Sequence, residues 1–532
     1  MNKEDSRMRK LLATILSIAL VLSMASTLAE AAGKDFAYPT QFDGELTYWI
    51  PLNANVAASE ASLNDTPFAQ YLYEATGIKV NYIHPTMGSE VEGFNLLLAS
   101  GELPDIIEAS WDSYYPAGLD AAIANGLVLD LTEYQHLMPN YMATLASNET
   151  WEKMAKTDSG KYAGFHFIRG EAFLQVYAGT IIRRDWLDKI SMDVPTTVDE
   201  WTQMLTKFRD ELGAESPLIT RNGIPDIMDS DAFVGAFGVS NGFYINDEGK
   251  VAYGRMEEGW KKAIELLAGW YENGLLAQDF ITMTGADKNA AVLNGDGGAF
   301  FGLTGSGIGV FMNSAKEAGN NEFNLVGAPY PTLEKGTTPE FGHYDNPLPG
   351  LVCTISPKSE HIEEAIRLLD YGYSQEGNNL FNFGKEGISY TIMDGEPTYT
   401  DVVLKPEGGI SIGQGIARVA RSSYGGPFVQ ALGYFLQYLQ LDIQKEAVAN
   451  WSSTNAAKHK LPPLSVSEAD SKEFNNIITE VNTFVAEYTS LAIAGDYDLA
   501  NFESDYVEEL KKIGIERAIE IYQQAYDRYL AR

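Results

Sequence analysis

The chain has 532 residues, which is too long for one hydrophobic core and predicts two lobes. Hydrophobic residues make up 45% of the sequence and charged residues 21%, as in a soluble globular protein. The formal net charge of −35 argues against nucleic acid as a partner and, more weakly, against a highly anionic sugar polymer, since a local site can differ from the mean.

Residues 1–31 have the pattern of a secretory signal peptide. Basic residues precede the apolar segment Leu11–Met24, which is too short for a typical membrane span, and Ala29–Ala31 has the small-x-small form of a cleavage site. The only cysteine is Cys353, so no cysteine stands at that site to carry a lipid anchor. We expect export to a periplasm, to the medium or to the cell surface.

The first predicted elements alternate between strand and helix. Glu45–Ile50 predicts a strand, Pro67–Thr76 a helix and Ile78–Ile83 a second strand. The loop after the first strand carries Asn53 and Asn55, at the sheet edge where α/β proteins bind ligands. These two amides fit either a ligand hydroxyl group or an ordinary turn.

The segment Leu96–Ile107 reads LLLASGELPDII and predicts a helix, a tight turn and a buried strand. Gly101 is a helix stop, Pro104 forces a turn, and the apolar run from Asp105 is typical of a parallel strand. An ordinary α/β connection has the same pattern. With the elements before it, the segment completes two successive βα units.

Aromatic and acidic residues follow this strand directly. Aromatic rings match the flat C–H faces of sugars, and carboxylates beside them accept hydrogen bonds from hydroxyl groups. Packing of the rings beneath a loop is an equal alternative. From this run we predict three ligand-binding residues: Trp111, Asp112 and Tyr114.

Two further patterns lie in the middle of the chain. Thr197 and Glu200 have the spacing of a capping box at the start of a helix that runs to about Leu212. Gly238–Gly242 matches the G-x-S-x-G pattern of a hydrolase nucleophile elbow, which needs a strand before it and a helix after it. Because the next residues predict a hairpin, we interpret this match as chance.

Motifs spaced along the chain resemble the extracellular solute-binding proteins of family 1, and within them the LplA-like and alginate-oligosaccharide-binding-like branch. These proteins are the carbohydrate-capturing partners of bacterial ABC importers. The motifs are LLASGxLPDI at 97–106, GxxxDLT at 126–132, IRxDWL at 182–187, YxxGL at 271–275, APYP at 328–331, GxEGxxY at 384–390 and YxxAYDRY at 522–529.

The resemblance implies an α/β, two-lobed periplasmic-binding-protein fold of type II, in which hinged lobes grip an oligosaccharide in the cleft between them. We expect an N-terminal lobe at 38–178 plus about 335–400. The C-terminal lobe is expected at 179–334 plus about 401–532.

The resemblance also implies site residues. The family's glycine-rich stretch, here 295–309, lies at the cleft, and the glutamate of the GxEGxxY motif faces the ligand, although an exposed salt bridge is the alternative for that glutamate. The resemblance predicts Phe301, Ser306, Glu386 and Tyr390. Further candidates are Tyr344 and Asp345, in the loop before the predicted strand at Gly350, and Tyr424, which is next to Gly425.

The expected function is binding without catalysis, with delivery of the oligosaccharide to ABC transporter permease subunits by a monomer. Many relatives carry an EF-hand-like calcium loop, but residues 208–217 lack its alternating oxygen ligands, so we expect no calcium there. The six histidines form no zinc motif, and we expect no cofactor. A secreted polysaccharide-degrading enzyme and a binder of a peptide or other polar solute remain alternatives, since 73 acidic residues leave a glycosidase-like carboxylate pair open.

Overall fold

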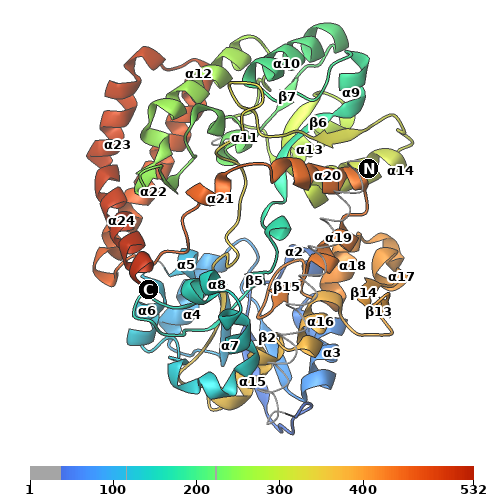
Figure 1. Ribbon diagram of the computed structural model, residues 1–532, viewed down its shortest axis with the longest axis vertical. Coiled ribbons are helices and arrows are strands. Elements are labelled where there is room, and N and C mark those ends of the chain that lie inside the picture. Colours follow the sequence, from blue (N-terminus) through green and yellow to red (C-terminus); the bar gives the residue numbers. More distant parts are fainter. Residues whose placement is uncertain (1–36, 116, 222–224) are drawn as a thin grey trace, which may run out of the picture. The chain divides into compact units, whose positions relative to one another are not determined.

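The computed structural model describes residues 37–115, 117–221 and 225–532, which form two compact units (Figure 1). Unit 1 contains the chain up to Ile168, Leu348–Tyr434 and Arg532, and unit 2 contains Arg169–Pro347 and Phe435–Ala531. The predicted signal peptide, residues 1–31, lies outside the described residues.

The chain changes units at other positions than the sequence predicted. The changes fall after residues 168, 347 and 434 rather than after 178, about 334 and about 400. The largest difference has a clear cause, because α18 (Ile412–Val419) packs on α2 (Ala54–Ala57) and α3 (Pro67–Thr76) of unit 1. Residues 401–434 therefore belong to the first unit.

Unit 1 is built on a five-stranded sheet with strand order β2-β1-β3-β12-β4. β1 (Glu45–Trp49) runs parallel to β2 (Lys79–Ile83) and to β3 (Ile106–Ser110). β12 (Leu351–Ile355) runs antiparallel to both of its neighbours, β3 and β4 (Phe165–His166). Two βα units thus begin the chain, as the sequence predicted.

The predicted helix–turn–strand segment is confirmed in unit 1. α4 (Glu90–Ser100) ends at Gly101, whose φ of 70° lies in the left-handed region that favours glycine. Pro104 is buried in the turn, and β3 begins at Ile106. Alternate strand residues then pack on opposite faces of the sheet, with Ile106 in one core cluster and Ile107 in the other.

Unit 2 is built on a four-stranded sheet with strand order β11-β6-β10-β7. β6 (Ala178–Arg183) pairs antiparallel with β11 (Leu325–Gly327) and with β10 (Ala299–Leu303), and β10 pairs parallel with β7 (Leu218–Ile219). Sequence analysis did not identify β10, which lies inside the glycine-rich stretch 295–309.

Amphipathic helices supply most of the unit 2 core. Trp201 on α10 (Val198–Leu212) and Trp260 on α12 (Glu258–Glu272) are fully buried. The long helix α22 (Glu468–Ala494), red in Figure 1, runs beside the green α12. Among the described residues, no helix combines the length and the apolar composition that crossing a membrane requires.

Candidate functional site

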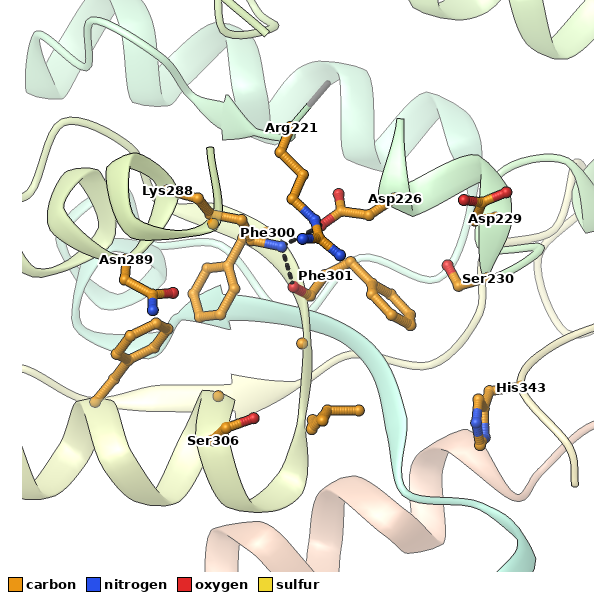
Figure 2. Close-up of a pocket in the computed structure, with 15 residues that line it drawn as sticks. Arg221, Asp226, Asp229, Ser230, Lys288, Asn289, Phe300, Phe301, Ser306 and His343 are labelled. Carbon is orange, nitrogen blue, oxygen red and sulfur yellow. Dashed lines mark hydrogen bonds and ion pairs between the residues drawn. The ribbon is translucent and has the colours of Figure 1, made fainter. Parts of the chain in front are cut away.

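Unit 2 contains a pocket of about 480 Å³ at the end of β10 (Figure 2). Residues of β10, of α13 (Gly285–Asn294), of the short helix α11 (Asp226–Asp229) and of the turn Thr304–Gly309 line it. This volume lies in the range of pockets that hold small molecules.

Aromatic side chains form one wall of the pocket. Phe300 is 1% exposed and packs edge to face on Phe311, with 5.4 Å between ring centroids. Phe301 also lines the pocket but is only partly buried, so part of its ring surface is open. A ring in this position can contact the apolar face of a ligand.

A cluster of charged residues lines the pocket next to these rings. Lys288 of α13 forms an ion pair with Asp226 Oδ2 and donates a hydrogen bond to the carbonyl oxygen of Phe301 at 2.7 Å. The Thr220 hydroxyl donates to Asp226 Oδ1 at 2.8 Å, and Arg221 Nε lies 3.6 Å from Asp226 Oδ2. Lys288 is 8% exposed, so its contacts hold α13, α11 and β10 in fixed positions around the pocket.

The remaining rim of the pocket is polar. Asp229 Oδ1 pairs with Arg255 at 3.2 Å, and Ser230 and His343 also line the pocket. Burial lowers the pKa of His343 to about 4, so its ring is neutral near pH 7. Asn289 and Ser306 add an amide and a hydroxyl group to the lining.

A second pocket of about 230 Å³ adjoins the first. The two pockets share Asp229, Ser230 and His343. Tyr344 and Asp345 line the second pocket, where the Asp345 carboxylate pairs with Arg169 at 3.0 Å and accepts a hydrogen bond from the Tyr177 hydroxyl at 2.7 Å.

The structure thus brings four of the predicted site residues of unit 2 into two adjoining pockets. Phe301 and Ser306 line the larger pocket, and Tyr344 and Asp345 line the smaller one. The Asp345 carboxylate already contacts Arg169 and Tyr177, so it has less hydrogen-bonding capacity left for a ligand. Ligand binding by all four residues stays a prediction.

The predicted residues of unit 1 line neither pocket. The Asn53 side chain caps α2 and accepts a hydrogen bond from Asn55 N at 2.9 Å, which is the turn-forming alternative. Glu386 is exposed, Tyr390 is 5% exposed and packs near Phe383, and the Arg421 guanidinium lies 5.2 Å from the Tyr424 ring. Their role in binding also stays a prediction.

The expectation that Trp111 offers a ring face to a ligand is wrong in this structure. Trp111 is fully buried, and its ring packs edge to face on Phe94 at 5.1 Å, as Tyr114 does at 5.4 Å. Packing beneath a loop is therefore the correct alternative for Trp111. Burial also raises the pKa of the neighbouring Asp112 to about 6.

Sequence reasoning missed most of the polar lining of the larger pocket. Arg221 follows β7, Lys288 and Asn289 lie on α13, and His343 comes from a later loop. The pairing of β7 with β10 brings Arg221 to the pocket, and the packing of α13 on β7 adds Lys288 and Asn289. Lysine and asparagine near a helix start are ordinary surface residues in a sequence, so no local pattern marks them.

The G-x-S-x-G match is not a nucleophile elbow. A short 3-10 helix precedes Gly238, and the hairpin of β8 (Phe243–Ile245) and β9 (Val251–Tyr253) follows, as interpreted from the sequence. The Ser240 hydroxyl donates to Asp231 at 3.0 Å, which makes it part of a turn.

The segment at 208–217 forms the end of α10 and a compact turn. Gly213 is left-handed, and Ala214 N donates to the carbonyl oxygen of Phe208 at 3.0 Å. Among the described residues, no three or more His, Cys, Asp or Glu side chains gather where they could hold a metal ion.

Comparison with known proteins identifies the family. The model of the bacterial extracellular solute-binding protein family matches residues 53–379, more than half of the chain. The chain therefore belongs to this family.

Lipoprotein LipO of Bacillus subtilis (strain 168) is 27% identical over 371 residues, which cover 65% of this chain and 68% of LipO. The fructooligosaccharide ABC transporter substrate-binding protein FusA of Streptococcus pneumoniae serotype 4 (strain ATCC BAA-334 / TIGR4) is 20% identical over 557 residues, which cover 98% of each chain. Among solved structures, alginate-binding protein AlgQ2 without calcium ion matches with a TM-score of 0.74 and 20% identity, over 92% of this chain and 100% of that chain. The chain thus has the α/β fold of the two-lobed substrate-binding proteins, as the sequence predicted.

Proposed function

We propose that the chain is the extracytoplasmic substrate-binding component of an ABC importer and captures an oligosaccharide. The pocket of unit 2 carries the proposal, because it combines the partly buried ring of Phe301 with fixed hydrogen-bonding groups. Sugars need both, since their C–H faces are apolar and their hydroxyl groups are polar. The relatives named for fructooligosaccharide and for alginate support carbohydrate as the ligand class.

In this proposal the protein binds the sugar and releases it unaltered. Asn289 and Ser306 bind hydroxyl groups, Phe301 contacts a ring face, and the ligand stabilises the conformation that it contacts best. The loaded monomer then delivers the sugar to the permease subunits in the membrane.

The enzyme alternative requires a carboxylic acid that is free to exchange a proton with a glycosidic oxygen. Asp226, the most enclosed carboxylate of the pocket, is bound by Lys288 and Thr220. Such a fixed carboxylate suits recognition better than catalysis. We therefore include the absence of turnover in the proposal.

The test is a thermal-shift panel with the chain from Ala32 onward, followed by chromatography of the ligands. A ligand at about a hundred times its Kd adds about 2.7 kcal/mol to the free energy of unfolding. Stabilisation by an oligosaccharide that is recovered intact supports the proposal. Cleavage of the sugar would show an enzyme, and stabilisation by peptides alone would replace carbohydrate as the ligand class.

The Phe301→Ala variant tests the placement of the ligand. Loss of one aromatic contact costs about 0.5–1.5 kcal/mol, so calorimetry should show a several-fold weaker Kd. Leu333→Ala is the matched control, because Leu333 is 54% exposed and lies outside the pocket. Equal affinities of the two variants would place the ligand elsewhere.

A further inference from the structure

The charges around the larger pocket do not balance. Arg221 and Lys288 both face the single carboxylate of Asp226, while Asp229 is opposed by Arg255 at 3.2 Å. Together with Arg255, which pairs with Asp229 from outside the pocket lining, this ion-paired network holds three cations against two carboxylates, in a chain whose net charge is −35. His343 adds no charge near pH 7, because its pKa is lowered to about 4 by burial.

Arg221 is the cation of this network that a ligand can reach. Its side chain is 53% exposed, and Figure 2 shows it reaching toward Asp226 and Lys288. The separation of 3.6 Å between Arg221 Nε and Asp226 Oδ2 is too long for a hydrogen bond. The same carboxylate already binds Lys288 and Thr220, so the guanidinium keeps hydrogen-bonding capacity for a ligand.

The first turn of α13 lies beside Arg221. Gly285, the first residue of α13, lines the pocket, and a Cβ atom there would lie 3.6 Å from an Arg221 terminal nitrogen. The guanidinium thus lies close to the N-terminal end of a ten-residue helix, whose partial positive charge is already met by the Asp287 carboxylate of its capping box. The cation available to a ligand here is therefore Arg221, which lines the same pocket as Phe301.

We propose that the pocket takes a sugar that bears a carboxylate, and that Arg221 binds this carboxylate. A guanidinium matches a carboxylate with two parallel hydrogen bonds, which a neutral sugar cannot accept in the same way. The inference rests on the proposed function and adds the chemical class of the sugar. The inference concerns one contact in one pocket. It is therefore compatible with the net negative charge of the chain, which disfavours binding of highly anionic polymers.

The experiment compares acidic oligosaccharides with their own neutral forms. Trimers of galacturonate, glucuronate and mannuronate, each as the free acid and as the full methyl ester, are titrated by calorimetry into the wild type, Arg221→Gln, Arg221→Lys and Arg184→Gln. Arg184 is the matched control, because it pairs with Asp188 at 2.8 Å, is 39% exposed and lies outside the pocket.

We expect at least one acid to bind more tightly than its ester. Arg221→Gln should weaken that acid by about tenfold to a hundredfold, which is the usual value of hydrogen bonds to charged groups, and should change the ester little. Arg221→Lys should lose part of the affinity, and Arg184→Gln none. Esters that bind as tightly as the acids, or an equal loss for acid and ester in Arg221→Gln, overturn the inference but leave the proposed function intact. If none of these trimers binds but another oligosaccharide stabilises the protein in the thermal-shift panel, the inference fails alone; if no oligosaccharide of that panel stabilises it, the proposed function itself fails.

Discussion

Trp111 and Phe301 show how burial separates two aromatic residues that were both predicted to bind the ligand. Trp111 directly follows β3, and Phe301 lies within β10. Trp111 is fully buried against Phe94, whereas Phe301 keeps part of its ring open to a pocket. At the scale of single residues, neighbours that are distant in sequence decide whether a ring packs or binds.

Trp111→Ala should therefore lower stability rather than affinity. Removing a buried tryptophan leaves a cavity and costs about 3–5 kcal/mol. Urea unfolding monitored by circular dichroism measures this loss. Tyr73→Ala, at a position that is 47% exposed, is the control and should change stability by less than about 0.5 kcal/mol. A small effect of Trp111→Ala would contradict the buried position.

Asp231 introduces a pH dependence that can be isolated with one variant. Burial raises its pKa to about 7, although hydrogen bonds from Asn241 N at 2.7 Å and the Ser240 hydroxyl at 3.0 Å act in the opposite direction. The unfolded carboxyl group titrates near its ordinary value of about 3.9. The folded state thus binds the proton more tightly, and the contribution of Asp231 to stability falls as the pH rises from about 4 to about 7.

Asp231→Asn should remove this dependence. An asparagine oxygen can accept from Asn241 N, its amide can donate to the Ser240 oxygen, and asparagine tolerates the φ of 63° found at Asp231. We expect the variant to match the wild type near pH 4 and to exceed its melting temperature above pH 7. Calorimetric scans between pH 4 and pH 8 test this, and parallel profiles for both proteins would refute it.

At the scale of elements, Asp105 fastens the start of β3. Its carboxylate accepts hydrogen bonds from Thr47 N at 2.8 Å and Thr47 Oγ1 at 2.7 Å on β1, and from Ser359 Oγ at 2.5 Å before α15 (Ile362–Tyr371). The turn of the LLLASGELPDII segment thus joins three elements of unit 1.

Asp105→Ala should leave these donors without their acceptor and cost about 1–3 kcal/mol. The shift of the urea midpoint measures the loss, and Asp43→Ala, at an exposed aspartate near the start of β1, serves as the control. If both variants lose equally little, the junction does not depend on Asp105.

The N-terminus of α10 differs slightly from the capping box that the sequence predicted. Thr197 caps α10, because its side chain accepts from Glu200 N at 3.2 Å. The reciprocal bond of the predicted capping box shifts by one residue, since Glu200 accepts from Thr196 N at 2.8 Å. The helix boundary was predictable from the sequence, but the partner of Glu200 depended on how the chain enters the helix.

At the scale of the whole molecule, net charge governs the response to salt. A net charge of −35 sets many carboxylates against each other, and this repulsion opposes the folded state. Raising the ionic strength from 0.01 M to 0.15 M shortens the Debye length from about 30 Å to about 8 Å. The melting temperature should rise over this range, equally in NaCl and KCl, and a fall would show that attractive ion pairs dominate.

The sequence by itself determined the family, the two-unit α/β class and the elements of unit 1 with strong local signals. Helix α3, the stop at Gly101 and strand β3 were predictable because their apolar spacing and turn residues lie within a few positions of each other. Only the tertiary structure decided the unit boundaries, the burial of Trp111 and the pocket of Arg221, Lys288 and Phe301. The physical reason is the separation of the interacting residues along the sequence. Backbone conformation depends on residues a few positions apart, whereas a pocket depends on distant side chains that the tertiary fold brings together.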